Sequence, residues 1–266
     1  MIDLSQFEIF ETEKHRKQSL WRFLLGRRFA FNMALLRIVY RCRTLSLAGK
    51  FDNDEFFNQS DIIHDALERY GAKFKITGLQ NLHFDGPCVV IANHMSLLET
   101  QILPWVIGSF KPLTIVMKKS LYDSWIFNPV AIATKSISLT RENLRADIDV
   151  IMKEGVEYLN KGRSILLFPE GTRKPYFRRS EFNSLGIKLA VRAGVRVVPI
   201  ALKTNFLVPG KKVPDFGTLH PERPVYIHVG EPLIIEGRGK KEHQQVLDFL
   251  ETNLREWGVE IKEDEV

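Results

Sequence analysis

Residues 88–99 read CVVIANHMSLLE, and this stretch decides the fold that the sequence predicts. Its first five residues form an uninterrupted apolar run, which is typical of a strand buried on both faces of a sheet. His94 follows shortly after the run, so it is expected at the carboxyl edge of that sheet. Glu99 comes three residues after Ser96, the spacing of a capping box at a helix start. The stretch therefore predicts a strand, a loop that carries His94, and a helix.

His94 and Glu99 together suit the activation of a hydroxyl group. If His94 lies in the loop, the Glu99 carboxylate can turn back to an imidazole N–H, fix the tautomer and stabilise the imidazolium. Histidine side chains ordinarily titrate near pH ~6.5, which suits a general base. The alternative is a loop histidine followed by a plain capping glutamate. No metal is expected, because the other histidines are scattered without ligand spacing.

A second motif, FPEGTR at residues 168–173, follows the apolar run 164–167. Proline stops a strand and Gly171 permits a tight turn, so backbone N–H groups and the Arg173 guanidinium can face an anion such as a phosphate monoester. Backbone N–H groups near His94 or Gly171 are expected to stabilise an oxyanion. Arg141, after the strand-like residues 136–140, offers a second guanidinium. The alternative is a surface turn with solvated arginines.

With these motifs in place, the chain resembles the glycerophospholipid acyltransferases, the family that includes the 1-acylglycerol-3-phosphate acyltransferases. The matching blocks are residues 93–99, 128–141, 168–173 and 197–202. The resemblance implies that His94 is the general base and that Glu99 orients it. It also implies a lysophospholipid acceptor and an acyl-CoA or acyl-carrier-protein donor, with no other cofactor. The residues that it implies for acceptor binding are Arg141, Glu170, Gly171, Thr172 and Arg173.

Three departures from the family pattern leave the acceptor open. The carboxylate of the first block is usually Asp, and Glu99 is one methylene longer. Lys135 and Ser136 stand where the family usually has Gly, and residues 182–185 replace the usual Phe-Lys-Lys-Gly. The prediction is an O-acyltransferase for 1-acyl-sn-glycerol 3-phosphate in phospholipid biosynthesis. The alternatives are another lysolipid or glycerol-phosphate acceptor, a thioester hydrolase, or a non-catalytic lipid-binding protein.

Apolar runs and amphipathic stretches alternate along most of the chain, which favours an α/β fold with a mixed, mostly parallel sheet flanked by helices. An α/β acyltransferase domain is expected over 72–266, with a long loop over 208–224. The expected strands are 73–77, 88–92, 113–117, 136–140, 163–168, 195–202 and 225–229. The expected helices are 60–70, begun by Ser60, and 96–108, 143–160, 183–193 and 240–256.

The net charge of +6 comes from one segment near the N-terminus. Residues 14–50 hold ten Lys or Arg and no Asp or Glu. On a helical plot, Leu20, Leu24, Phe31, Leu35 and Ile38 share one face, with Trp21 and Val39 beside it. Such a helix suits the surface of an anionic membrane, so residues 1–71 are predicted to be a basic amphipathic membrane-association segment. The alternative is that the apolar face packs on the α/β domain.

Composition narrows the location further. No run reaches the roughly 18 apolar residues of a membrane span, and no signal peptide is expected. Two cysteines, Cys42 and Cys88, fit a reducing compartment rather than a disulfide framework. Nucleic-acid binding is not expected, because no recognition motif accompanies the basic charge. The sequence therefore predicts a peripheral or monotopic protein on the cytoplasmic face of a membrane.

Overall fold

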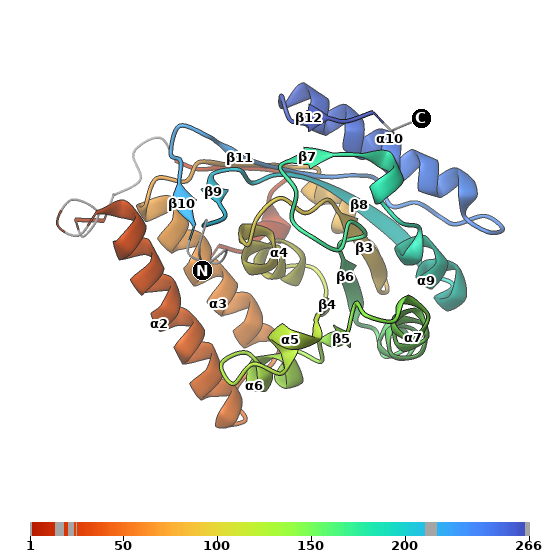
Figure 1. Ribbon diagram of the computed structural model, residues 1–266, viewed down its shortest axis with the longest axis horizontal. Coiled ribbons are helices and arrows are strands. Elements are labelled where there is room, and N and C mark those ends of the chain that lie inside the picture. Colours follow the sequence, from red (N-terminus) through yellow and green to blue (C-terminus); the bar gives the residue numbers. More distant parts are fainter. Residues whose placement is uncertain (1, 14–18, 21–23, 25, 211–216, 264–266) are drawn as a thin grey trace.

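The computed structural model describes residues 2–13, 19, 20, 24, 26–210 and 217–263. Its central element, within these residues, is an eight-stranded mixed sheet with the strand order β1-β2-β11-β8-β3-β6-β4-β5 (Figure 1). The strands from β8 to β5 are parallel, whereas β11 is antiparallel to β8 and β1 to β2. The predicted fold class is confirmed. The bounds are β1 Ile9–Glu11, β2 Phe74–Thr77, β3 Cys88–Ala92, β4 Leu113–Lys118, β5 Ile137–Leu139, β6 Ser164–Leu167, β8 Arg196–Lys203 and β11 Val225–Val229.

Helices cover both faces of the sheet, because alternate residues of each central strand point to opposite sides. In β3, Val90 belongs to one core cluster and Val89 to the other. The first cluster includes residues of α2, α3 and α4, and the second includes residues of α9 and α10, helices that lie on opposite sides of the sheet in Figure 1. The bounds are α2 Arg27–Leu47, α3 Asn53–Arg69, α4 Leu98–Gly108, α5 Lys119–Tyr122, α6 Asn128–Ala133, α7 Leu144–Val150, α8 Val156–Asn160, α9 Leu185–Ala193 and α10 Lys240–Glu256.

Short elements complete the fold, and the sequence pattern did not indicate them. The segment 208–224, predicted as a loop, contributes to a small hairpin of β9 and β10, and residues 211–216 within it lie outside the described residues. A second small sheet pairs β7 with β12 near the C-terminal end of the chain. A π-helical segment joins α7 to α8 in the region predicted as one helix. The bounds are β7 Tyr176–Phe177, β9 Leu207–Val208, β10 Thr218–Leu219, β12 Glu260–Ile261 and the π-helical segment Ile151–Gly155.

Ser60, predicted to begin a helix, lies inside α3 instead. The Asp52 carboxylate caps α3 by accepting the N–H of Glu55 at 2.9 Å, so the helix begins seven residues before the predicted start. Ser60 is buried against α4, where its hydroxyl donates to the carbonyl of Gln101 and accepts the N–H of Trp105 at 3.0 Å. That carbonyl and N–H would bond to each other in an uninterrupted helix. Ser60 therefore docks α3 into α4, which makes it a packing residue.

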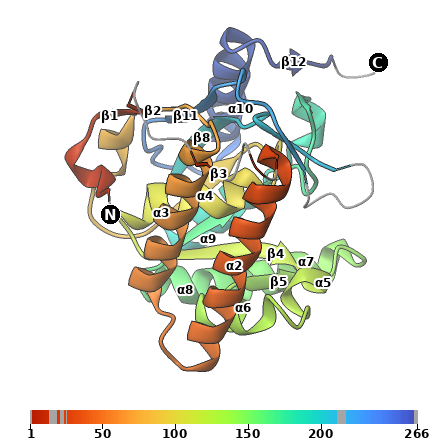
Figure 2. The ribbon, with the colours of Figure 1, turned by 90° about the vertical axis from the view of Figure 1, so that its left-hand side faces the viewer.

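The sequence predicts a separate segment over 1–71, and parts of it contribute to the same sheet and core as the rest of the chain, whereas Leu20 and Leu24 of the predicted apolar face are exposed. β1 adds an edge strand beside β2, and Phe10 contacts Trp105 edge to face at 5.4 Å between ring centroids. On α2, Phe31 and Leu35 are buried, and Ile38 packs against the same cluster. Figure 2 shows α2 and α3 side by side. For Phe31, Leu35 and Ile38 the structure agrees with the alternative interpretation, in which the apolar face packs on the α/β domain.

Candidate active site

The register of β3 and β6 brings the two sequence motifs together. The strands are parallel neighbours with Ile91 opposite Leu167, so both chains leave the sheet at the same edge. Just beyond that edge, the backbone N–H of His94 donates to Glu170 Oε2 at 2.5 Å. The carbonyl of His94 accepts the N–H of Lys174 at 2.8 Å. The loop that carries His94 is therefore held on both backbone groups by the 168–173 motif and the residue after it.

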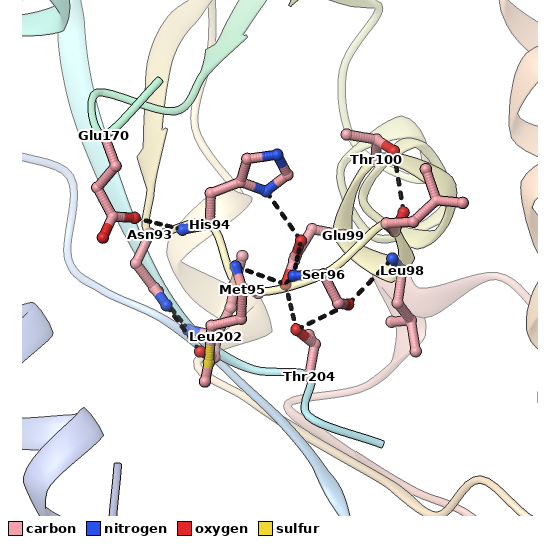
Figure 3. A network of polar contacts seen from close by, with 11 residues as sticks. Asn93, His94, Met95, Ser96, Leu98, Glu99, Thr100, Glu170, Leu202 and Thr204 are labelled. Carbon is pink, nitrogen blue, oxygen red and sulfur yellow. Dashed lines mark hydrogen bonds and ion pairs between the residues drawn. The ribbon is translucent and has the colours of Figure 1, made fainter. Parts of the chain in front are cut away.

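Glu99 is buried below His94 and binds several donors at once (Figure 3). Its Oε2 lies 2.9 Å from His94 Nδ1, and it also accepts the backbone N–H of Ser96 at 2.9 Å. Its Oε1 accepts the N–H groups of Met95 at 3.1 Å and Ser96 at 2.8 Å. The bond from Ser96 is the half of a capping box that the spacing predicts. A fully buried carboxylate with this many donors is held in one orientation.

The imidazole of His94 is oriented by two contacts. Glu99 engages Nδ1, so Nδ1 carries the proton and Nε2 is the basic nitrogen. The ring stacks on Phe168 with 4.3 Å between centroids and an interplanar angle of 21°. The side chain is 12% exposed, and Nε2 points away from Glu99 in Figure 3. His94 is thus a base with a fixed tautomer and a small exposed fraction.

Glu170 lies against the His94 loop, whereas the resemblance implies contact with the acceptor. Burial raises the pKa of its carboxyl to about 8, opposed by the His94 N–H and by Lys174, and the nearby Glu99 adds to the increase. The N–H groups of His94 and Gly171 are also engaged, the first by Glu170 and the second by the carbonyl of Phe168 at 3.0 Å. These two N–H groups are therefore engaged within the protein, and the oxyanion donors expected near His94 or Gly171 stay a prediction.

The rest of the second motif forms a turn that faces outward. Gly171 has a φ of +69°, a conformation that glycine adopts readily. Asn183 secures the turn by donating its side-chain amide to the carbonyl of Pro169. Thr172 is exposed and Arg173 is half-buried. This part of the motif therefore presents polar groups at the edge of the sheet where His94 lies.

Arg141 follows β5 at the same edge and is held through its backbone. Its φ is +62°, which is uncommon for a residue with a side chain. The buried carboxylate of Asp147 accepts the N–H of Arg141 at 2.7 Å and the N–H of Thr140 at 2.9 Å. Burial and the charge of Arg173 lower the pKa of Arg141, and Asp147 opposes the change. The two guanidinium groups are near enough to repel each other, and a bound anion would relieve that repulsion.

Sequence analysis did not identify the residues that support the site through hydrogen bonds to its loops and side chains. Asp147 lies in a helix and has no motif around it. Thr204 follows β8 and donates its hydroxyl to Glu99 Oε1. Asn93 pairs with the backbone of Leu202 in both directions, at 2.9 and 2.8 Å. Its place inside the first motif is the one signal that the sequence offered. No cluster of three or more metal-binding side chains occurs among the described residues.

An oriented histidine–carboxylate pair, with two guanidinium groups at the same edge of the sheet, is the kind of site that activates a hydroxyl of a substrate that carries an anionic group. The family model described as "Acyltransferase" matches residues 73–203. A 1-acyl-sn-glycerol-3-phosphate acyltransferase of Pseudomonas aeruginosa is 31% identical over 191 residues, which are 72% of this chain and 71% of that protein. The chain belongs to this acyltransferase family.

Two further proteins give the range of the similarity. The crystal structure of the 1-acyl-sn-glycerophosphate acyltransferase PlsC from Thermotoga maritima has a TM-score of 0.64 and covers 90% of this chain and 97% of that one. At 20% identity it supports the fold. A lyso-ornithine lipid O-acyltransferase of Pseudomonas aeruginosa is 28% identical over 165 residues, which are 61% of this chain and 58% of that protein. Relatives in this group thus carry names with different acceptors.

Proposed function

We propose that the protein transfers a fatty acyl group from a thioester of coenzyme A or acyl carrier protein to the hydroxyl of 1-acyl-sn-glycerol 3-phosphate. The observation that carries the proposal is the His94–Glu99 pair, held against the 168–173 motif with Nε2 facing outward. The 31% identical relative supports the choice of acceptor. Such a site supplies its own base and takes its nucleophile from the substrate.

The reaction follows from this geometry. Nε2 of His94 takes the proton of the acceptor hydroxyl while Glu99 stabilises the imidazolium. The hydroxyl oxygen attacks the thioester carbonyl, and the C–S bond breaks as the new ester forms. The imidazolium then returns the proton to the thiolate, which leaves as the free thiol. Arg141 and Arg173 bind the phosphate of the acceptor, so a group that does not react positions the one that does.

A second acceptor class is supported by the departures from the family pattern and by one of the relatives. Glu replaces the usual Asp of the family, and one relative is named for a lyso-ornithine lipid.

The test is a panel of acceptors with each thioester donor: 1-acyl-sn-glycerol 3-phosphate, other lysophospholipids, lyso-ornithine lipid and glycerol 3-phosphate. The proposal predicts acceptor-dependent thiol release, fastest with 1-acyl-sn-glycerol 3-phosphate. Full release without acceptor would indicate a hydrolase, and tight lipid binding without release would indicate a non-catalytic protein.

We also propose that the protein works at the surface of an anionic membrane, on its cytoplasmic side. None of the described helices is long and apolar enough to cross a bilayer. The face of α2 that points away from the core carries an exposed stripe of large apolar residues, at helical spacing: Phe29, Met33, Leu36, Tyr40 and Leu47. Arg37 and Arg41 flank it and are exposed, and Arg43 lies over the ring of the exposed Trp125. Apolar and basic groups together suit an interface with anionic lipid.

Co-sedimentation with vesicles tests this surface. The double variant Phe29→Asp/Leu36→Asp should lose most of its binding to anionic vesicles, and wild-type binding should weaken as salt increases. Ile234→Asp is the control, because Ile234 is also an exposed apolar residue but lies outside the stripe. Unchanged binding by the double variant, or equal loss in the control, would move the membrane contact elsewhere on the protein.

A further inference from the structure

Thr204 lies directly after β8, on the opposite side of Glu99 from His94 (Figure 3). β8 pairs with β3 in parallel, and Asn93 extends that pairing beyond the end of β3 through its two bonds to Leu202. This pairing places Thr204 next to the His94 loop, where both Thr204 and Glu99 are completely buried. β8 thus reaches the active site through a side chain that belongs to neither motif.

The hydroxyl of Thr204 has a fixed direction. An ionised carboxylate can accept hydrogen bonds and has none to donate, so the proton between Thr204 Oγ1 and Glu99 Oε1 belongs to Thr204. The Ser96 hydroxyl donates to Thr204 Oγ1 at 3.0 Å, and Ser96 in turn accepts the N–H of Leu98 at 3.1 Å. The donors run in one direction, from the first turn of α4 through two hydroxyls to Glu99.

The two carboxylate oxygens of Glu99 face different side chains. Oε2 faces His94, whereas Oε1 faces Thr204. The length of the Glu side chain brings the carboxylate within reach of both partners. An Asp side chain is shorter by one C–C bond, about 1.5 Å, so its carboxylate would stand further from His94 and Thr204 on the same backbone. The longer side chain, which departs from the family's usual Asp, therefore fits a site that has a hydroxyl at position 204.

We propose that Thr204 is a positioning residue, which acts through Glu99 to hold the catalytic histidine, and that Glu99 and Thr204 function as a pair. The proposal rests on the proposed acyl transfer. Substrate would touch His94, while Thr204 stays buried behind Glu99. The titratable groups near Glu99 are His94 on the β3 loop and Glu170 on the β6 loop, and Thr204, which follows β8, adds a neutral donor.

The test compares Thr204→Val, Thr204→Ser and Thr134→Val. Thr204→Val keeps the shape and removes the donor, so kcat should fall about 10–100-fold, as for other residues that orient a catalytic group. The acid limb of the kcat/KM profile should also move to higher pH, because a carboxylate with one donor fewer stabilises the His94 imidazolium more strongly. Thr204→Ser restores a hydroxyl and should recover most of the rate. Thr134→Val removes another buried hydroxyl, bonded to the carbonyl of Val130 at 2.9 Å, and should leave the acid limb in place.

A double-mutant cycle separates positioning from packing. Glu99→Asp withdraws the carboxylate, so Thr204→Val should cost less than about twofold more in that background. Equal losses in both backgrounds, or an unmoved acid limb in Thr204→Val, would overturn the proposal. The His94 imidazole is also followed by ¹⁵N NMR, where Thr204→Val should shift the titration of its signal. This readout needs no turnover, so an inactive wild type would refute the acyl transfer while Thr204 is still tested.

Discussion

The His94 loop after β3 and the Arg141 turn after β5 leave the same edge of one sheet, yet they hold their side chains in different ways. His94 is fixed through its ring, by Glu99 and Phe168, and the carboxylate behind it is completely buried. Arg141 is fixed through its backbone, by Asp147, and its side chain is partly covered but more exposed than that of His94. A reacting group needs a preset orientation, whereas a group that binds an anion needs reach. Substitutions in the first loop should therefore reduce kcat, and those in the second should raise KM.

The largest effect is expected for His94→Ala. Loss of the general base should lower kcat about 10³–10⁴-fold, with little change in the KM for the acceptor. Steady-state thiol release with saturating thioester measures both constants. His83→Ala is the control, because His83 lies at the protein surface and binds the carbonyl of Ser5. A large increase in KM for His94→Ala would mean that this loop binds the acceptor as the Arg141 turn does.

Glu99→Gln should give the next largest effect. The amide keeps the size of the side chain but has a single acceptor oxygen, so it cannot serve both His94 and Thr204. We expect kcat to fall about 10²–10³-fold, part of the usual contribution of acid–base catalysis. The same assay measures it, with circular dichroism to confirm that the variant is folded. A folded variant with the wild-type rate would remove the carboxylate from the mechanism.

Arg141→Ala should act on binding. A hydrogen bond to a charged group contributes about 1.5–3 kcal/mol, so the KM for a phosphate-bearing acceptor should rise roughly 10–100-fold. Arg145→Ala is the matched control, an exposed arginine four residues further along the chain. Comparing acceptors with and without a phosphate sharpens the result. An equal increase in KM for both acceptors would show that Arg141 does not bind the phosphate.

A smaller effect, on thermal stability, is expected for Glu170→Gln. Its pKa is about 8 in the folded protein against an ordinary value of 4.5, so the unfolded chain ionises first as pH rises. Stability from this group is therefore complete below pH 4.5 and declines until about pH 8. Glu170→Gln removes the decline, so its Tm should exceed that of wild type by at least about 3 °C at pH 8 but not at pH 4.5. Glu231→Gln, at an exposed position, should follow wild type at both pH values.

Sequence alone predicted the parts of this fold that have strong local patterns. The bounds of β3, β11 and α10 agree with prediction to the residue, because long apolar runs and clear amphipathic periods specify them. The strands of two or three residues, such as β1 and β7, are too short to carry a period. The start of α3 was missed because Ser60 is a typical cap residue that here packs against α4.

The residues of the candidate site show the same contrast between those that a local pattern marks and those that none marks. Motifs placed His94, Glu99 and Glu170 near one another, and the parallel register of β3 and β6 explains why they meet. The roles of these residues stay predictions. Thr204 was missed because its contact with Glu99 is distant in sequence. Asp147 was missed because it binds the Arg141 backbone, six residues away, from a helix that carries no motif. No local pattern marks such partners.

The most direct measurement is the ratio of thiol released to acyl ester formed, in wild type and His94→Ala with acyl thioester and 1-acyl-sn-glycerol 3-phosphate. If His94 activates the acceptor hydroxyl, wild type should give one ester for each thiol. His94→Ala should lose both products in parallel. Thiol release without ester in wild type, or ester formation by His94→Ala at the wild-type rate, would contradict the mechanism.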